Sequence, residues 1–98
     1  MLAPSDYKVV LTKHARRRAK ARHHLKKAAA LRAAEAAIAA HIAAHGKPEE
    51  AFLAQHEGRD WMVNANGEHT FLVITTFASD DPLNPVVRGY GMRNGKEW

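Results

Sequence analysis

His14 opens a run of basic residues, and its imidazole could act as a general acid or base because this group titrates near neutral pH. The alternative is that His14 is one more residue of a cationic surface, which the composition around it favours. Arg88 and Tyr90, near the end of the chain, are expected on one face of a strand, where they could bind phosphate. The alternative for them is a half-exposed strand with one packed face. The candidate catalytic residues are therefore His14, Arg88 and Tyr90.

The segment from Lys13 to Lys27 (KHARRRAKARHHLKK) contains eight Lys/Arg, three His and no acid. A block of one charge sign repels itself and usually meets an anionic partner, because Lys and Arg neutralise phosphates. Solubilising surfaces usually mix both signs, and this segment does not. It also lacks aromatic residues, so base stacking is not expected from it. The predicted nucleic-acid-binding residues are Lys13, Arg16, Arg17, Arg18, Lys20, Arg22, Lys26 and Lys27.

His41 and His45 stand four residues apart, a spacing that lets two imidazoles on one helix face share a metal ion. No recognisable motif supplies a third ligand, although His56, Glu49 and Glu50 are candidates. Two surface histidines near the end of a helix are the commoner explanation. The sequence therefore predicts neither a metal nor a cofactor.

The 98 residues predict a single domain over residues 1–98 with a net charge of +5. Residues 1–34 hold ten Lys/Arg and one acid, a net +9, whereas residues 35–98 hold five Lys/Arg and nine acids, a net −4. Such asymmetry favours a polyanionic partner. The chain has no cysteine, no apolar stretch of membrane-spanning length and no apparent secretory signal. A cytoplasmic protein without a membrane partner is expected.

The element order is expected to be β-α-α-β-β-β, an α+β fold. A β-prone run at residues 7–12 leads into a helix that Thr12 caps and that continues from Lys13 to His45 without Gly or Pro. Gly46 ends this long helix, and Pro48 opens a short second helix that ends near Gly58. A three-stranded antiparallel sheet follows, with strands at residues 60–64, 70–77 and 86–92 and a hairpin turn at Asn66-Gly67.

The long helix is expected to change character along its length. Leu31, Ile38 and Ile42 form an apolar stripe that should pack on the sheet. The cations before it point in every direction round the helix axis, so residues 13–27 are expected to form a projecting basic arm. Residues 28–98 then form the packed helix and sheet. A homodimer is possible through the small residues Ala29, Ala33, Ala36 and Ala40.

The segment LTKHARRR, residues 11–18, resembles the start of small RelE-like domains, a superfamily of ribonuclease toxins. In these domains a first strand runs into a helix that begins T-K-H-A and continues with basic residues, and the element order is also similar. The resemblance implies metal-independent cleavage of RNA, in which the 2′-hydroxyl of the RNA attacks and basic residues stabilise the phosphorane. Only His14 and the residues Arg16 to Arg18 carry over by position. This sequence departs from the pattern in its long, alanine-rich first helix.

Three functions remain open on these grounds. The first is a non-catalytic nucleic-acid-binding protein that uses the basic segment, with RNA preferred over DNA. The second is the RelE-like endoribonuclease that the resemblance implies. The third is a small phage or mobile-element inhibitor or adaptor, whose basic helix docks on an acidic protein surface.

Overall fold

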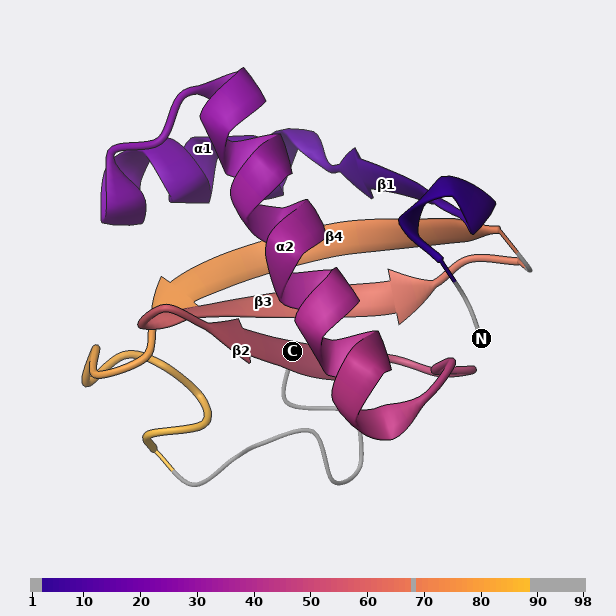
Figure 1. Cartoon of the computed structure of the whole chain (residues 1–98). Helices are drawn as coiled ribbons and strands as arrows, with labels where there is room; N and C mark the ends of the chain where they lie inside the picture. The colour runs from indigo at the N-terminus through magenta and orange to yellow at the C-terminus, as the bar shows by residue number, and fades with distance from the viewer. Residues whose placement is uncertain (1–2, 68, 89–98) are drawn as a thin grey trace.

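Two helices and a four-stranded sheet make up the fold in a computed structural model, which describes residues 3–67 and 69–88 (Figure 1). A short 3-10 turn at Pro4–Asp6 precedes the first strand. The elements that follow are β1 (Lys8–Leu11), α1 (Lys13–His23), α2 (Lys27–His45), β2 (Phe52–His56), β3 (Arg59–Ala65) and β4 (Thr70–Ala78). The α+β class and the expected order β-α-α-β-β-β are confirmed.

The strands lie in the order β1-β4-β3-β2. The three later strands form an antiparallel sheet, as expected, but β2 takes the place of the strand predicted at residues 86–92. Strand β1 adds to this sheet in parallel, with Lys8 opposite Thr70 and Leu11 opposite Val73. The predicted hairpin turn joins β3 to β4, where Gly67 has a φ of 84° and Asn66 N donates to Thr70 O at 2.8 Å. Glycine suits this turn because it adopts positive φ without steric cost.

The short helix predicted after Pro48 is wrong, because the middle of this segment is the strand β2 and no helix forms in it. Phe52 and Ala54 are buried opposite Val63 and Trp61, so a period of two places both on the core face. The connection to β3 is the tight turn Glu57-Gly58, where φ is positive at both residues, 52° and 77°. Two positive φ values match the twist of antiparallel strands. Cross-strand pairing therefore overrides the local helix-start signal.

The strand expected over residues 86–92 is also not found where the structure describes it. Residues 86–88 belong to a turn rather than a strand, and residues 89–92 lie outside the described part of the chain.

The continuous helix predicted from Lys13 to His45 is wrong too, because it is interrupted after His23. His24 adopts a left-handed conformation, φ 57° and ψ 32°, and its N–H caps the carbonyls of Ala19 and Lys20. The next residue, Leu25, packs against the core. A left-handed residue at the end of a helix is the usual way to stop it, although glycine is the usual choice. Here the packing of Leu25 accompanies a turn that contains neither Gly nor Pro.

The structure also corrects the projecting basic arm that was expected over residues 13–27. Ala15 and Ala19 on α1 are fully buried and belong to the same core as the sheet residues. In Figure 1, α1 continues the line of β1 and lies along the edge of β4. The helix is not polar all round, because two alanines one turn apart make a narrow apolar face. Alanine lets the helix backbone approach the sheet closely, and the longer cations extend past this contact on either side.

Helix α2 crosses one face of the sheet and covers the main core (Figure 1). The expected stripe is confirmed, with Ile38 and Ile42 buried and Leu31 half-buried against them. Among the described residues, the largest buried apolar side chains from the strands are those of Phe52, Trp61, Met62, Val63, Phe71 and Val73.

The outer face of α2 carries exposed alanines and charges. Ala36 and Ala40 are exposed, whereas Ala29 and Ala33 are half-buried, and a homodimer through these residues stays a prediction. Glu35 and Arg32 are exposed as well. None of the described helices is long and apolar enough to cross a membrane.

Candidate nucleic-acid interface

Helix α1 is fixed to the outer edge of β4 by hydrogen bonds to backbone carbonyls. Strand β1 ends at Leu11, so the last carbonyls of β4 have no neighbouring strand on this side. Thr12 N donates to Val73 O at 3.1 Å, and Thr12 Oγ1 donates to Ile74 O at 3.2 Å. At the other end of α1, Arg22 Nη1 donates to Thr76 O at 2.7 Å. Buried carbonyls need such partners, and these bonds determine which face of α1 points outward.

Thr12 has a second role as the predicted N-cap of α1. Its Oγ1 accepts a hydrogen bond from Ala15 N at 3.0 Å. One threonine thus caps the helix and joins it to the sheet, which sets both the start and the direction of α1.

Because α1 is anchored through one side, its cations lie either on the opposite, outward face or on one of the two flanks between. Lys13, Arg17 and Lys20 are exposed and, at 100° per residue, lie opposite the buried Ala15 and Ala19. We call these three residues the outer cationic face. Helix α1 contains no acidic residue. This face therefore offers uncompensated positive charge to an anionic partner.

One flank of α1 borders a groove on the side of the sheet. His14, Arg18 and Arg22 are spaced four residues apart along the helix, so their side chains follow one line. They border a cavity of about 180 Å³, which we call the His14 groove. Its opposite wall is formed by Met62, Thr75, Phe77 and Pro85.

Arg22 is the best-defined cation of the His14 groove. Its guanidinium carbon lies 4.0 Å from the centroid of the Phe77 ring, a cation–π contact. Burial lowers the pKa of Arg22, and the charge of nearby Arg18 lowers it further, while Asp81 opposes both. Arginine remains charged despite such shifts. The groove therefore combines two neighbouring guanidinium groups with an aromatic ring.

Two of the three predicted catalytic residues, His14 and Arg88, belong to segments that border the His14 groove. His14 lines the groove, and Arg88 belongs to the turn at residues 85–88 whose first residue, Pro85, lines the same groove. This turn is held by Arg88 N, which donates to Asn84 O at 3.0 Å. Tyr90 lies outside the described residues. The structure thus brings His14 and the turn that carries Arg88 to one groove.

A buried polar cluster fixes the loop that leads into this turn, and the sequence had not revealed it. Asp60 and Asn84 are both fully buried, and Asn84 Nδ2 donates to Asp60 Oδ2 at 2.8 Å and to Ala78 O at 2.9 Å. Ser79 Oγ donates to Asp60 Oδ1 at 2.5 Å. The only sequence signal was the position of Asn84 between Pro82 and Pro85, which is typical of a rigid turn.

His23 belongs to the scaffold rather than to the cationic surface. Its Nε2 lies 2.8 Å from Thr76 Oγ1, and that hydroxyl donates to Asp60 O at 2.7 Å. Because the hydroxyl proton is already used, Nε2 must be the donor to Thr76. Burial lowers the pKa of His23, and the charges of Arg59 and Arg22 lower it further, against Asp60. The neutral imidazole therefore suits this position.

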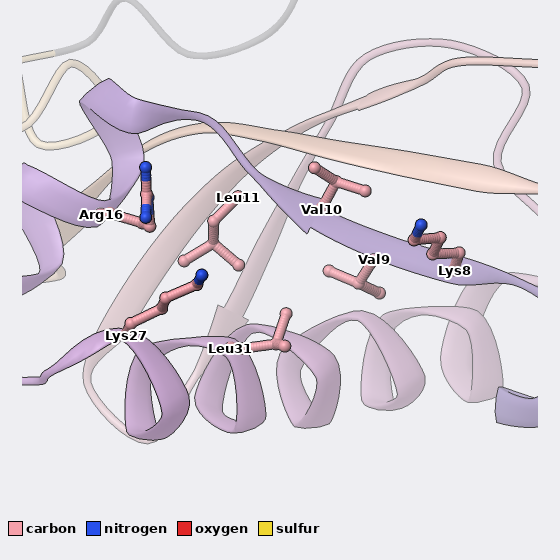
Figure 2. Close-up of a pocket in the computed structure, with 7 residues that line it drawn as sticks. All are labelled: Lys8, Val9, Val10, Leu11, Arg16, Lys27 and Leu31. Carbon is pink, nitrogen blue, oxygen red and sulfur yellow. The ribbon is translucent and has the colours of Figure 1, made fainter.

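The remaining cations of the predicted interface lie after α1. Lys26 precedes α2 as its N-cap, and Lys27 is its first residue. Lys27 and Arg16, the latter on the second flank of α1, border a different cavity together with Lys8 (Figure 2). Seven of the eight predicted nucleic-acid-binding residues are therefore divided among the outer cationic face and two separate hollows, and Lys26 lies outside all three.

The histidine pair at the end of α2 makes ring contacts. The His41 and His45 rings lie 4.6 Å apart, and His41 stacks on Phe52 at 4.5 Å. Burial lowers the pKa of His41, with a further contribution from His45. Within residues 3–67 and 69–88, no three His, Cys, Asp or Glu side chains gather closely enough to hold a metal ion.

Comparison with known proteins does not identify a family for this chain. No protein-family model, no curated protein and no solved structure matches the chain. The resemblance to RelE-like domains therefore rests on the LTKHARRR segment and on the element order alone.

Proposed function

We propose that this protein binds nucleic acid, RNA in preference to DNA, through the outer cationic face and the His14 groove. The observation that carries the proposal is the docking of α1, whose buried alanines and sheet-edge hydrogen bonds hold Lys13, Arg17 and Lys20 outward. A rigid helix presents its cations in a constant arrangement, so less side-chain and backbone entropy is lost on binding.

The two parts of the interface suit different groups of a strand. The outer cationic face provides charges for phosphates, which dominate affinity for nucleic acids and carry little sequence information. The His14 groove adds the Arg22–Phe77 contact, which offers an aromatic ring and a guanidinium plane to an unstacked base. Splayed bases are typical of single-stranded RNA loops, which is the reason for placing RNA before DNA.

Purification with and without nuclease treatment tests the proposal first. We expect nucleic acid to copurify with the untreated protein, and the treated protein to rebind single-stranded RNA with an affinity that falls steeply with salt. Recovery of one acidic protein and no nucleic acid would instead support the adaptor function. Absence of RNA and DNA binding at low salt would contradict the proposal.

Metal-independent RNA cleavage is the second candidate, and the convergence at the His14 groove favours it. His14, Arg18 and Arg22 line the groove, which Pro85, the start of the turn carrying Arg88, also borders. In this reaction the 2′-hydroxyl loses its proton to His14, and its oxygen attacks the adjacent phosphorus. The bond to the 5′ oxygen breaks, and that oxygen takes a proton from solvent. The guanidinium groups stabilise the charge on the phosphorane.

The products identify the 2′-hydroxyl as the attacking group, and the His14 variant separates this activity from a contaminating nuclease. RNA incubated with a chelator should yield 2′,3′-cyclic phosphate and 5′-hydroxyl ends, and a 2′-deoxy substitution at the cleaved position should block the reaction. His14→Ala should abolish cleavage while RNA binding persists. Intact RNA after incubation, with and without ribosomes, would leave the binding function standing and exclude the ribonuclease.

A further inference from the structure

A second and larger hollow lies on the other flank of α1, away from the His14 groove. It has a volume of about 360 Å³, is open to solvent on one side, and is bordered by β1, the start of α1 and the start of α2 (Figure 2). We call it the β1 cavity. Its size is within the range of pockets that hold small organic ligands. Two of its residues, Arg16 and Lys27, are among those predicted from the sequence to bind nucleic acid.

The described residues that line the β1 cavity are of two kinds. Three are cationic, Lys8, Arg16 and Lys27, and four are aliphatic, Val9, Val10, Leu11 and Leu31. Among residues 3–67 and 69–88, no acid, no aromatic ring and no side-chain hydrogen-bond acceptor lines it. In Figure 2, Arg16 and Lys27 stand at one end and Lys8 at the other, with the aliphatic side chains between them. The lining therefore suits an anion that carries an aliphatic body.

The position of β1 at the edge of the sheet adds backbone donors to these walls. Lys8 N and Thr12 N both donate toward β4, to His69 O and Val73 O. Because successive residues of a strand direct their N–H and C=O groups to alternate sides, those of Val9 and Leu11 point away from β4. They face the free edge of the sheet, where the cavity lies.

Arg16 is the strongest reason to expect an anion in the cavity. It is half-buried, and its Nε is buried without a hydrogen-bond partner among the described residues. None of the described carboxylates forms an ion pair with it. A partly desolvated charge without a counter-charge is unfavourable, and a bound anion would compensate it.

We propose that the β1 cavity binds an aliphatic carboxylate, with the carboxylate at Arg16 and Lys27 and the hydrocarbon chain over Val9, Leu11 and Leu31. Sugars and nucleobases are poorly matched, because their donors would meet no side-chain acceptor and their rings no aromatic partner. This site is separate from the outer cationic face and from the His14 groove, through which we propose that nucleic acid binds. The volume corresponds to about a dozen groups of the size of a water molecule, at roughly 30 Å³ each, which accommodates a chain of about eight to ten carbons.

Calorimetric titration of the full chain with hexanoate, octanoate and decanoate, below their micellar concentrations, tests this proposal. Each added CH₂ should tighten binding about fourfold up to the length that fills the cavity. In NMR spectra, octanoate should shift the methyl signals of Leu11 and Leu31. Arg16→Gln should weaken octanoate binding about tenfold or more, because it removes a charge-assisted contact. The matched control is Arg17→Gln, the same change at the next residue, on the outer face, and it should bind octanoate like the native protein.

Further probes separate the anionic and aliphatic requirements. Acetate and inorganic phosphate should bind weakly, since they lack the chain, and octan-1-ol and octylammonium should bind weakly, since they lack the negative charge. Equal binding of octan-1-ol would show a purely apolar site, and equal binding of phosphate a general anion site, and either result would overturn the proposal. So would failure of octanoate to bind. If Arg16→Gln does not fold, Lys27→Gln at the exposed start of α2 gives the same comparison.

Discussion

Arg22 Nη1 donates a hydrogen bond of 2.7 Å to the backbone carbonyl of Thr76, across 54 positions of the sequence. This bond joins the most basic segment of the chain to the last part of β4. The guanidinium replaces the backbone N–H that a neighbouring strand would provide, because β1 has already ended at Leu11. The basic segment is therefore part of the sheet's edge, and its cations are positioned by the fold.

Removal of this bond should destabilise the protein although Arg22 lies on a cationic helix. Arg22→Ala should lower the free energy of unfolding by about 1–3 kcal/mol, because it leaves a partly buried carbonyl without its charged donor and removes the contact with Phe77. Arg17→Ala, at an exposed position of the same helix, should change it by less than about 0.5 kcal/mol. Urea denaturation measures both. Similar values for the two variants would mean that the bond does not hold α1 in solution.

The buried alanines give an independent test of the docking of α1. Ala19→Leu inserts a larger side chain where Ala19 is 0% exposed, so it should cost about 1–3 kcal/mol of stability. Ala21→Leu makes the same change at an exposed position of α1 and should be nearly neutral. Thermal denaturation of the pair is the measurement. If Ala19→Leu is tolerated as well as Ala21→Leu, the helix projects into solvent and the docking is wrong.

The environment of His23 should make stability depend on pH. Its pKa is lowered in the folded protein from the ordinary value of 6.5, so below that pH the unfolded chain binds more protons than the native one. The stabilisation is fully present above about pH 6.5 and is lost as the pH falls toward the folded pKa. His41 contributes in the same direction. The urea concentration at the midpoint of unfolding should therefore decrease as the pH is lowered from 7.5 to 5.

His23→Gln identifies the share that His23 contributes to this pH dependence. Glutamine can still donate to Thr76 Oγ1, but it does not titrate. The variant should lose less stability than the native protein over the same pH range. Parallel curves for the two proteins would show that His23 titrates alike in the folded and unfolded states.

Several features of the fold could be predicted from residues that lie close together in the sequence. Thr12 as a helix cap, the Asn66-Gly67 turn and the stripe of Leu31, Ile38 and Ile42 each depend on neighbouring residues, and the structure contains all three. The break after His23 was not predictable in this way. No Gly or Pro marks it, and it depends on the packing of Leu25 against a core that forms only in the folded chain.

The strand β2 and the His14 groove were missed for the same physical reason. The helix-start signal at Pro48 is local, whereas β2 is stabilised by pairing with β3. The groove joins His14, Arg18 and Arg22 to Thr75 and Phe77, which are more than fifty positions away. Ala15 and Ala19, the residues that bring these segments together, were indistinguishable from surface alanines in the sequence.

The central claim, that the outer cationic face binds RNA, is tested most directly by the salt dependence of binding in a matched pair of double variants. Arg17→Gln/Lys20→Gln changes this face, and Arg32→Gln/Lys47→Gln removes the same charge from exposed positions outside α1. Fluorescence anisotropy with single-stranded RNA should show that the first variant binds more weakly and that its slope of log affinity against log salt is shallower by about 1.4, roughly 0.7 for each lost phosphate contact. The second variant should keep the native slope. Equal losses in both variants, or no RNA binding by the native protein at low salt, would contradict the account.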